Sequence, residues 1–229
     1  MIQDNVNQIQ ENISSICRKL GRNPQEITLV GVTKFAENDK IEAALAAGIV
    51  HIAENRVQEG KRKYPLIKGS GAKIMKHLIG HLQTNKVKDA LKIFDLIQSV
   101  DSLKLAQEIE KEAAKLGRTF DILVQINTSG EEQKYGLAPA DTMTLFDALA
   151  NFKFIRVLGL MAMAPLTEDQ EIVRDSFRKL RMHRDQITEH FKGSNTVEMK
   201  YLSMGMSQDF SLALEEGSNM VRIGSAIFK

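Results

Sequence analysis

The hydrophobic and polar positions of the chain alternate between two periods. Between residues 5 and 20, apolar side chains recur at helical spacing, at Val6, Ile9, Ile13, Ile16, Cys17 and Leu20. Gly21 and Pro24 follow this segment and are typical of a helix end. The run ITLVGV at 27–32 is short and β-branched, which is typical of a buried strand, and the Ala-rich segment 38–47 predicts the next helix.

The same alternation continues to the last residues. Strand-like runs lie at 49–54, 72–80, 94–100, 119–127, 152–161, 197–204 and 220–224. Helical patterns lie between them at 55–63, 82–91, 101–116, 139–150, 168–191 and 207–216. Asp101 stands where the 101–116 helix needs its N-cap. Repeated strand–helix units predict a parallel sheet. About eight such units suit a (β/α)8 TIM barrel with an extra N-terminal helix, and an open doubly wound sheet is the alternative.

Composition narrows the class of protein. A chain of 229 residues, 43% hydrophobic and 26% charged, fits one globular domain spanning 1–229. With 31 basic and 29 acidic residues, the net charge of +2 argues against a nucleic-acid binder. The single cysteine, Cys17, excludes an intramolecular disulfide and indicates a reducing compartment. Neither a signal peptide nor an apolar run of ~20 residues is recognised, so we expect a cytoplasmic protein away from membranes. No large exposed apolar helix face stands out, so a monomer is expected.

The carboxyl end of the first strand carries a candidate nucleophile. Active sites of TIM barrels form where the strands end, and Lys34 directly follows the run 27–32 on the same side as Val30 and Val32. A lysine amine in an apolar pocket attacks carbonyl groups and forms Schiff bases. The alternative is a structural lysine whose stem is buried and whose amine reaches water.

The last two strand ends predict an anion site. Gly205 lies in SMGMS after the seventh strand, and Gly224-Ser225 follows the eighth. Loops at these two places commonly bind phosphate in TIM barrels, because glycines let backbone N–H groups approach the anion and serine hydroxyls add donors. Ser203 and Ser207 are further candidate donors. The alternative is that the glycines only form turns.

Arg222 lies two residues before Gly224 and therefore on the same side of the last strand. An interior arginine needs a partner, which a bound anion, a ring nitrogen or a carboxylate such as Glu54 would provide. A carbonyl-trapping lysine, a phosphate site and an arginine together suggest pyridoxal phosphate, whose ring nitrogen commonly faces Asp or Arg. An arginine leaves that nitrogen unprotonated, which makes the ring a weaker electron sink.

Six segments resemble the pyridoxal phosphate homeostasis protein family. They are VGVTK (30–34), AENRVQE (53–59), HLIGHLQTNK (77–86), GLMAMAP (159–165), LSMGMSQDF (202–210) and GSNMVRIGSAIF (217–228). They follow the order of the family's motifs and cover nearly the whole chain. The resemblance implies a barrel similar to the N-terminal domain of bacterial alanine racemase.

The resemblance also implies a cofactor and its contacts. Pyridoxal 5'-phosphate is expected as an internal aldimine on Lys34. Ser203, Gly224 and Ser225 are expected to hold its phosphate, and Arg222 is expected to face the pyridine nitrogen.

Further positions match or depart from the family pattern. Asn55 matches the family's Asn in AEN and is expected near the ring, and His77 matches a family His whose role the resemblance does not specify. Gln98 stands where a His is expected and Leu78 where an aromatic is expected, so a proton-transfer group is missing at position 98. HLIGH contains His77 and His81 but lacks the glutamate of a zinc-hydrolase helix, so no metal site is expected.

The first functional hypothesis is a carrier or buffer in intracellular vitamin B6 homeostasis, without robust catalysis. Its partners would be the cofactor and apo forms of pyridoxal phosphate enzymes. The alternative is an amino-acid racemase, which needs acid–base groups on both faces of the substrate's α-carbon. Lys34 would serve one face, and Tyr201 is the tyrosine closest to the predicted site. A third reading is a Schiff-base barrel enzyme that acts on phosphosugars.

Overall fold

The computed structural model describes residues 1–68, 73–131 and 135–229. In these residues, eight parallel strands form a closed barrel in chain order, and β8 pairs with β1. The strands are β1 (Thr28–Val32), β2 (His51–Glu54), β3 (Met75–Leu78), β4 (Leu96–Val100), β5 (Phe120–Gln125), β6 (Ile155–Met161), β7 (Val197–Ser203) and β8 (Met220–Ile223). The predicted TIM barrel is therefore confirmed, and the closed strand order excludes the open doubly wound sheet.

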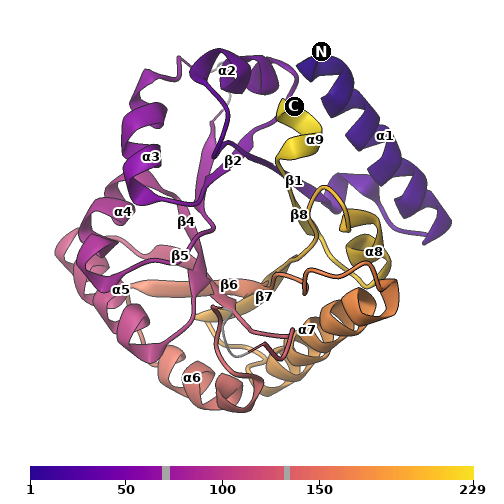
Figure 1. Ribbon diagram of the computed structural model, residues 1–229. Coiled ribbons are helices and arrows are strands. Elements are labelled where there is room, and N and C mark those ends of the chain that lie inside the picture. The colour runs from indigo at the N-terminus through magenta and orange to yellow at the C-terminus, as the bar shows by residue number, and fades with distance from the viewer. Residues whose placement is uncertain (69–72, 132–134) are drawn as a thin grey trace.

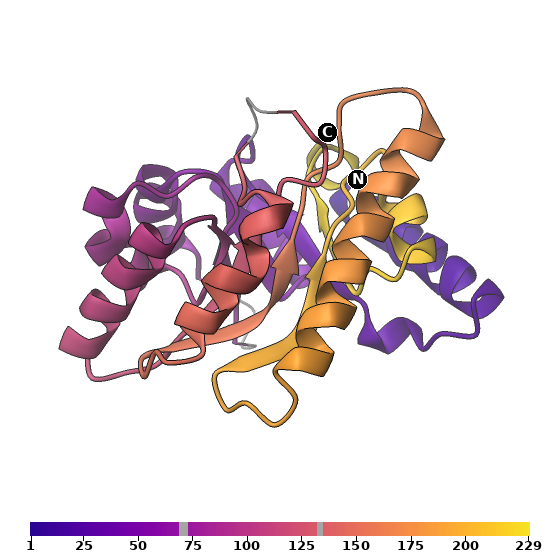
Figure 2. The ribbon, with the colours of Figure 1, turned by 90° about the horizontal axis from the view of Figure 1, so that it is seen from below.

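Helices surround the barrel, as Figures 1 and 2 show. They are α2 (Asn38–Ala46), α3 (Val57–Lys63), α4 (Val87–Ile93), α5 (Leu103–Lys115), α6 (Thr142–Leu149), α7 (Gln170–His190) and α8 (Phe210–Glu215). Because both faces of each strand are covered, the strands read as apolar runs and lack a simple alternation. None of the helices within the described ranges combines the length and apolarity that a bilayer span requires.

The extra N-terminal helix, α1 (Ile2–Lys19), packs outside the ring against α2, α8 and the last helix, α9 (Ser225–Phe228) (Figure 1). Its buried face consists of Val6, Ile9, Ile13 and Cys17. The Asn5 amide donates to the Ile227 carbonyl at 2.9 Å, and Arg22 donates to the carbonyls of Leu214 and Ser218 at 2.6 and 2.7 Å. The start of the chain therefore holds the segments that flank β8.

The cap of one helix and the presence of another differ from the predictions. Ser102, and not Asp101, caps α5, because its hydroxyl accepts the Leu105 N–H at 3.4 Å while the Asp101 carboxylate faces His81. The four-residue helix α9 was not predicted, since a single turn is too short to show a helical period.

The interior of the barrel is partly polar. A small apolar cluster fills part of it, formed by Val30, Ala53, Leu96, Leu123, Leu158, Met161 and Met220. TIM-barrel interiors are usually packed with branched apolar side chains. Here five polar side chains are also enclosed or half-enclosed: His51, His77, Gln98, Ser203 and Arg222. Buried polar groups need hydrogen-bond partners, and the arrangement of these partners defines the candidate site.

Candidate functional site

Lys34 lies just beyond the carboxyl end of β1, on the rim that we call the barrel mouth. Its side chain is exposed, and Nζ lies 4.7 Å from the ring centroid of Phe35, which is itself 88% exposed. The apolar pocket expected for this amine is therefore absent, because the chain turns outward after the buried residue Thr33. The amine is open to a reactant that enters from solvent.

A buried ion pair fixes the turn that carries Lys34. The Thr33 carbonyl accepts the Ala36 N–H at 2.9 Å and Lys63 Nζ at 2.7 Å. Lys63 Nζ also donates to Glu54 Oε1 at 2.8 Å, and the Thr33 hydroxyl donates to the same oxygen at 2.8 Å. Lys63 is 2% exposed and Glu54 is fully buried. Glu54, considered above as a partner of Arg222, is thus engaged by Lys63 instead.

Asn55 follows β2 and is half-buried beside the loop that follows β3. A Cβ atom added at Gly80 would lie 2.1 Å from the Asn55 carbonyl oxygen, so only glycine permits this approach. The Gly80 carbonyl accepts the Ser99 hydroxyl at 2.7 Å, which ties in the end of β4. Across this loop, His81 lies 3.3 Å from Asp101. The loops after β2, β3 and β4 therefore form one connected wall of the barrel mouth.

The loops after β7 and β8 face each other, as the anion-site prediction requires. The Ala226 N–H at the start of α9 donates to Ser207 Oγ at 3.3 Å, and Ser225 is exposed. A Cβ atom at Gly224 would lie 3.4 Å from Val32, so α9 begins beside the end of β1. Lys34 and the predicted phosphate-binding residues Gly224 and Ser225 thus stand on adjoining strand ends.

Arg222 is buried without an anionic partner among the residues that the structure describes. Nη1 donates to Ser203 Oγ at 2.7 Å, and Nη2 donates to the Ala162 carbonyl at 2.8 Å. Burial lowers the pKa of Arg222 to about 10, and the negative charge of Asp209 opposes this shift. The guanidinium is therefore charged at neutral pH. A buried charge whose hydrogen bonds go only to neutral groups favours binding of an anion or of an electron-rich ring atom.

From Ser203, hydrogen bonds continue through the barrel interior. The Ser203 hydroxyl donates to Gln98 Oε1 at 2.7 Å, and Gln98 Nε2 donates to His77 Nδ1 at 2.8 Å. His77 Nε2 lies 3.0 Å from His51 Nδ1. Ser203 and His77, both predicted as site residues, thus join Arg222 in one network. Gln98 and His51 were not predicted to belong to it; the signal was a glutamine within the apolar run LIQSV and a histidine within IVHIAE.

The acid sensitivity of folding tests the state of His77. Burial, and secondarily the neighbouring His51, lowers the pKa of His77 from 6.5 to about 3. Below pH 6.5 the unfolded chain binds a proton that the folded chain excludes, so this stabilisation is complete above pH 6.5 and is lost toward pH 3. The loss should approach about 1.4 kcal/mol per pH unit.

Urea unfolding between pH 7.5 and 4 measures this effect. His77→Gln should flatten the pH dependence, whereas His190→Gln, at the end of α7, should retain it. Equal slopes in the two variants would show that another group controls acid unfolding.

Comparisons with known proteins place the chain in a family. A family model described as the N-terminal domain of alanine racemase matches residues 5–229. The pyridoxal phosphate homeostasis protein of Aquifex aeolicus (strain VF5) is 38% identical over 225 residues, which cover 98% of this chain and 96% of that protein. The chain belongs to the pyridoxal phosphate homeostasis protein family. The family resemblance found in the sequence is thereby confirmed.

Two solved structures are similar to this family member. PipY of Synechococcus elongatus PCC7942, solved with PLP bound, superposes with a TM-score of 0.83 at 31% identity and covers 96% of this chain and 100% of that chain. Alanine racemase of Clostridium difficile 630 gives a TM-score of 0.75 at 19% identity and covers 98% of this chain and 55% of that chain. The racemase likeness shows the barrel fold alone.

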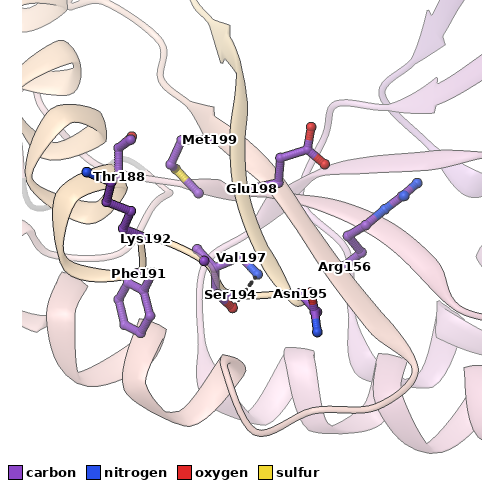
Figure 3. Close-up of a pocket in the computed structure, with 10 residues that line it drawn as sticks. Arg156, Thr188, Phe191, Lys192, Ser194, Asn195, Val197, Glu198 and Met199 are labelled. Carbon is purple, nitrogen blue, oxygen red and sulfur yellow. Dashed lines mark hydrogen bonds between the residues drawn. The ribbon is translucent and has the colours of Figure 1, made fainter.

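A surface hollow of about 480 Å³ lies elsewhere on this family member, where α7 ends and β6 and β7 begin (Figure 3). Arg156, Lys192 and Glu198 contribute charges of both signs to its lining. Arg156 is already paired with Asp121 at 2.9 Å. The hollow is on the amino-terminal side of the barrel and contains none of the predicted site residues. No cluster of three or more metal-ligating side chains occurs within residues 1–68, 73–131 and 135–229.

Proposed function

We propose that this protein binds pyridoxal 5'-phosphate through Lys34 and acts in intracellular pyridoxal phosphate homeostasis as a carrier or buffer. The observation that carries the proposal is the full-length similarity to PipY, whose solved structure has PLP bound. The site of this chain fits such a ligand, because an accessible amine, two facing loops and a buried cation occupy neighbouring strand ends. The bound group would supply an aldehyde for the amine and an anion for the loops.

Each residue has a proposed role. The Lys34 amine forms the covalent link, and Ser203, Gly224 and Ser225 bind the phosphate. Arg222 donates to the pyridine nitrogen. The Ser203 hydroxyl donates to Gln98 Oε1, so donating to a phosphate requires this hydroxyl to rotate.

Two other residues complete the proposed site. Asn55 lies near the pyridine ring of the cofactor, on the loop after β2, which approaches the loop after β3 closely at Gly80. His77 acts on the site indirectly, because it is buried and its ring nitrogens contact Gln98 and His51. It therefore supports the site from within the barrel and does not need to touch the cofactor.

The carrier reading is supported by the placement of the tyrosines. A racemase needs a second acid–base group opposite the lysine. Tyr201, the tyrosine nearest to Ser203 in sequence, packs against the apolar cluster inside the barrel. Tyr64 is buried against the outer face, and Tyr135 stacks on His81 with ring centroids 4.2 Å apart. Racemisation stays the second candidate, since Lys34 itself is accessible.

We further infer that residues 1–229 form a single cofactor-binding domain, which acts as a monomer in the cytoplasm. Its partners would be the cofactor and apo-enzymes that need it, and not nucleic acids or membranes. The near balance of 31 basic and 29 acidic residues supports the exclusion of nucleic acids.

Spectroscopy and intact mass test the proposed function. Incubation with pyridoxal phosphate should produce visible absorbance, and borohydride should then fix one cofactor mass on the protein. Lys34→Ala should lose both signals, whereas Lys104→Ala, on the exposed face of α5, should keep them. A wild-type protein that stays colourless and gains no mass would sink the proposal. Robust turnover of L-amino acids that requires Lys34 would favour the racemase, and a phosphosugar imine would not absorb visible light.

A further inference from the structure

The hydrogen bonds that link Arg222 to His51 through the barrel interior all have the same donor-to-acceptor direction. Arginine has no acceptor, so Arg222 must donate to Ser203 Oγ at 2.7 Å. The Ser203 hydroxyl therefore donates its hydrogen bond to Gln98 Oε1, and the Gln98 amide nitrogen donates to His77 Nδ1. Because His77 is neutral and its Nδ1 accepts, its one proton is on Nε2 and is donated to His51 Nδ1.

His51 is the terminal acceptor of this chain. It is the first residue of β2 and is half-buried, whereas the other four members of the hydrogen-bond network are buried: Arg222, Ser203, Gln98 and His77. Its register neighbours, Val30 on β1 and Met75 on β3, carry no charge. A proton on His51 Nδ1 would face the Nε2–H of His77, so the present polarity permits only a neutral His51.

We propose that Gln98, His77 and His51 are positioning residues of the anion site, and that their hydrogen-bond network couples protonation of His51 to anion binding at Ser203. Protonation of His51 favours anion binding, and anion binding favours protonation of His51. The proposal rests on the proposed function only in taking the cofactor's phosphate as the physiological anion.

The coupling follows because protonation of His51 reverses the donor and acceptor roles in the hydrogen-bond network from His51 to Ser203. When His51 takes up a proton on Nδ1, His77 must accept at Nε2 and carry its single proton on Nδ1. The Gln98 amide must then rotate, so that Oε1 accepts from His77 and Nε2 donates to Ser203. Ser203 Oγ now accepts from Gln98 as well as from Arg222, and its hydroxyl proton is released to donate elsewhere. His51 gains one proton, and every other member keeps the number it had.

Reversal is unfavourable without an anion. The released Ser203 proton would lack an acceptor in a buried site, and Gln98 would lose its contact to the Met220 sulfur at 3.3 Å. An anion bound at the Ser203 hydroxyl would accept the hydrogen bond that this hydroxyl is free to donate. It would also lie close to the positive charge of Arg222, because Arg222 Nη1 is 2.7 Å from Ser203 Oγ. Anion binding should therefore promote proton uptake by His51.

The charges around His51 set the direction of its titration. Burial, followed by the positive charge of Lys200 on β7, lowers the pKa of His51. From β3, His77 faces it as a neutral ring, while the Lys76 amine lies 5.9 Å from the ring of Tyr64, outside the barrel. An anion at the other end of the chain should raise the pKa of His51 toward its ordinary value. By linkage, affinity for the anion should rise as the pH falls.

Nitrogen-15 NMR of the histidine rings tests the direction of this hydrogen-bond network in wild-type protein. Without ligand at neutral pH, His77 should be protonated on Nε2 and not on Nδ1. Saturation with inorganic phosphate, and separately with pyridoxal phosphate, should shift the titration of His51 to higher pH. A His77 that carries its proton on Nδ1, or a His51 titration that both anions leave unchanged, overturns the proposal. These measurements need no substitution.

Two variants test whether the chain transmits the effect. His51→Gln keeps an acceptor for His77 but cannot take up a proton. Between pH 8 and pH 5.5, the affinity of the wild-type protein for pyridoxal phosphate should rise about fivefold or more because of this coupling. The His51→Gln variant should lack this rise. Gln98→Met interrupts the chain and should abolish the ligand-induced shift of His51. Parallel affinity–pH curves for wild type and His51→Gln would contradict the coupling.

The outcomes separate this inference from the proposed function. If wild-type protein takes up no pyridoxal phosphate, the proposed function fails, while the phosphate titration of His51 still decides the coupling. If pyridoxal phosphate binds but His51 does not respond, only the coupling fails.

Discussion

Lys63→Met should lower the free energy of unfolding by about 3–5 kcal/mol, because it leaves the Glu54 carboxylate buried without its cation. Glu54 is fully buried, and Lys63 Nζ lies 2.8 Å from its Oε1. The same substitution removes the donor to the Thr33 carbonyl, so the turn that presents Lys34 should loosen as well. Urea unfolding at neutral pH measures the stability, and the borohydride assay measures the reactivity of Lys34.

Two comparison variants make this prediction specific. Lys61→Met removes a cation that is 68% exposed and 3.8 Å from Asp89, and exposed pairs of this kind contribute about 0–1 kcal/mol. Combining Lys63→Met with Glu54→Leu removes both buried charges and should recover much of the loss. Equal destabilisation by Lys61→Met and Lys63→Met would refute the argument.

Gly80→Ala should be among the most damaging single-methyl additions near the site. The new Cβ would lie 2.1 Å from the Asn55 carbonyl oxygen and 2.8 Å from its carbon, and these are backbone atoms that cannot rotate away. Overpacking of this kind costs about 1–3 kcal/mol, and a backbone clash should reach or exceed the upper value. Asn55 should be displaced from the barrel mouth, so uptake of pyridoxal phosphate should fall with stability.

Gly117→Ala provides the control for this substitution. Gly117 has a φ of +63° and open space around the added methyl group, so it tests the cost of the left-handed backbone alone, about 1–2 kcal/mol. It lies after α5, away from the predicted site residues, and should leave cofactor uptake unchanged. If Gly80→Ala retained normal uptake and lost no more stability than Gly117→Ala, the close approach would not matter.

The sequence predicted the barrel because the fold depends on periodicity. Each strand was recognised from a short apolar run, and the parallel order followed from the intervening helices. Positions at strand ends were also predictable, since the ends of parallel strands share one rim. This is why the sequence alone assigns Lys34, Asn55, Gly224 and Ser225 to the barrel mouth.

Contacts inside the barrel could not be predicted in the same way. Ser203 and Gln98 are 105 positions apart, and their hydrogen bond depends on the register of several intervening strands. The Glu54–Lys63 pair was missed for a different reason, because one residue ends a strand and the other ends a helix, and no shared period links them. The exposure of Lys34 depends on the turn after Thr33, which a strand pattern does not describe.

The position of α1 has a consequence for synthesis of the chain. This helix is synthesised before the strands of the barrel, yet two of its packing partners, α8 and α9, follow β7 and β8 in the sequence. Its apolar stripe is therefore incompletely covered during most of translation, and such surfaces attract chaperones and promote aggregation. The native contacts of α1 are completed only after α9 has been synthesised.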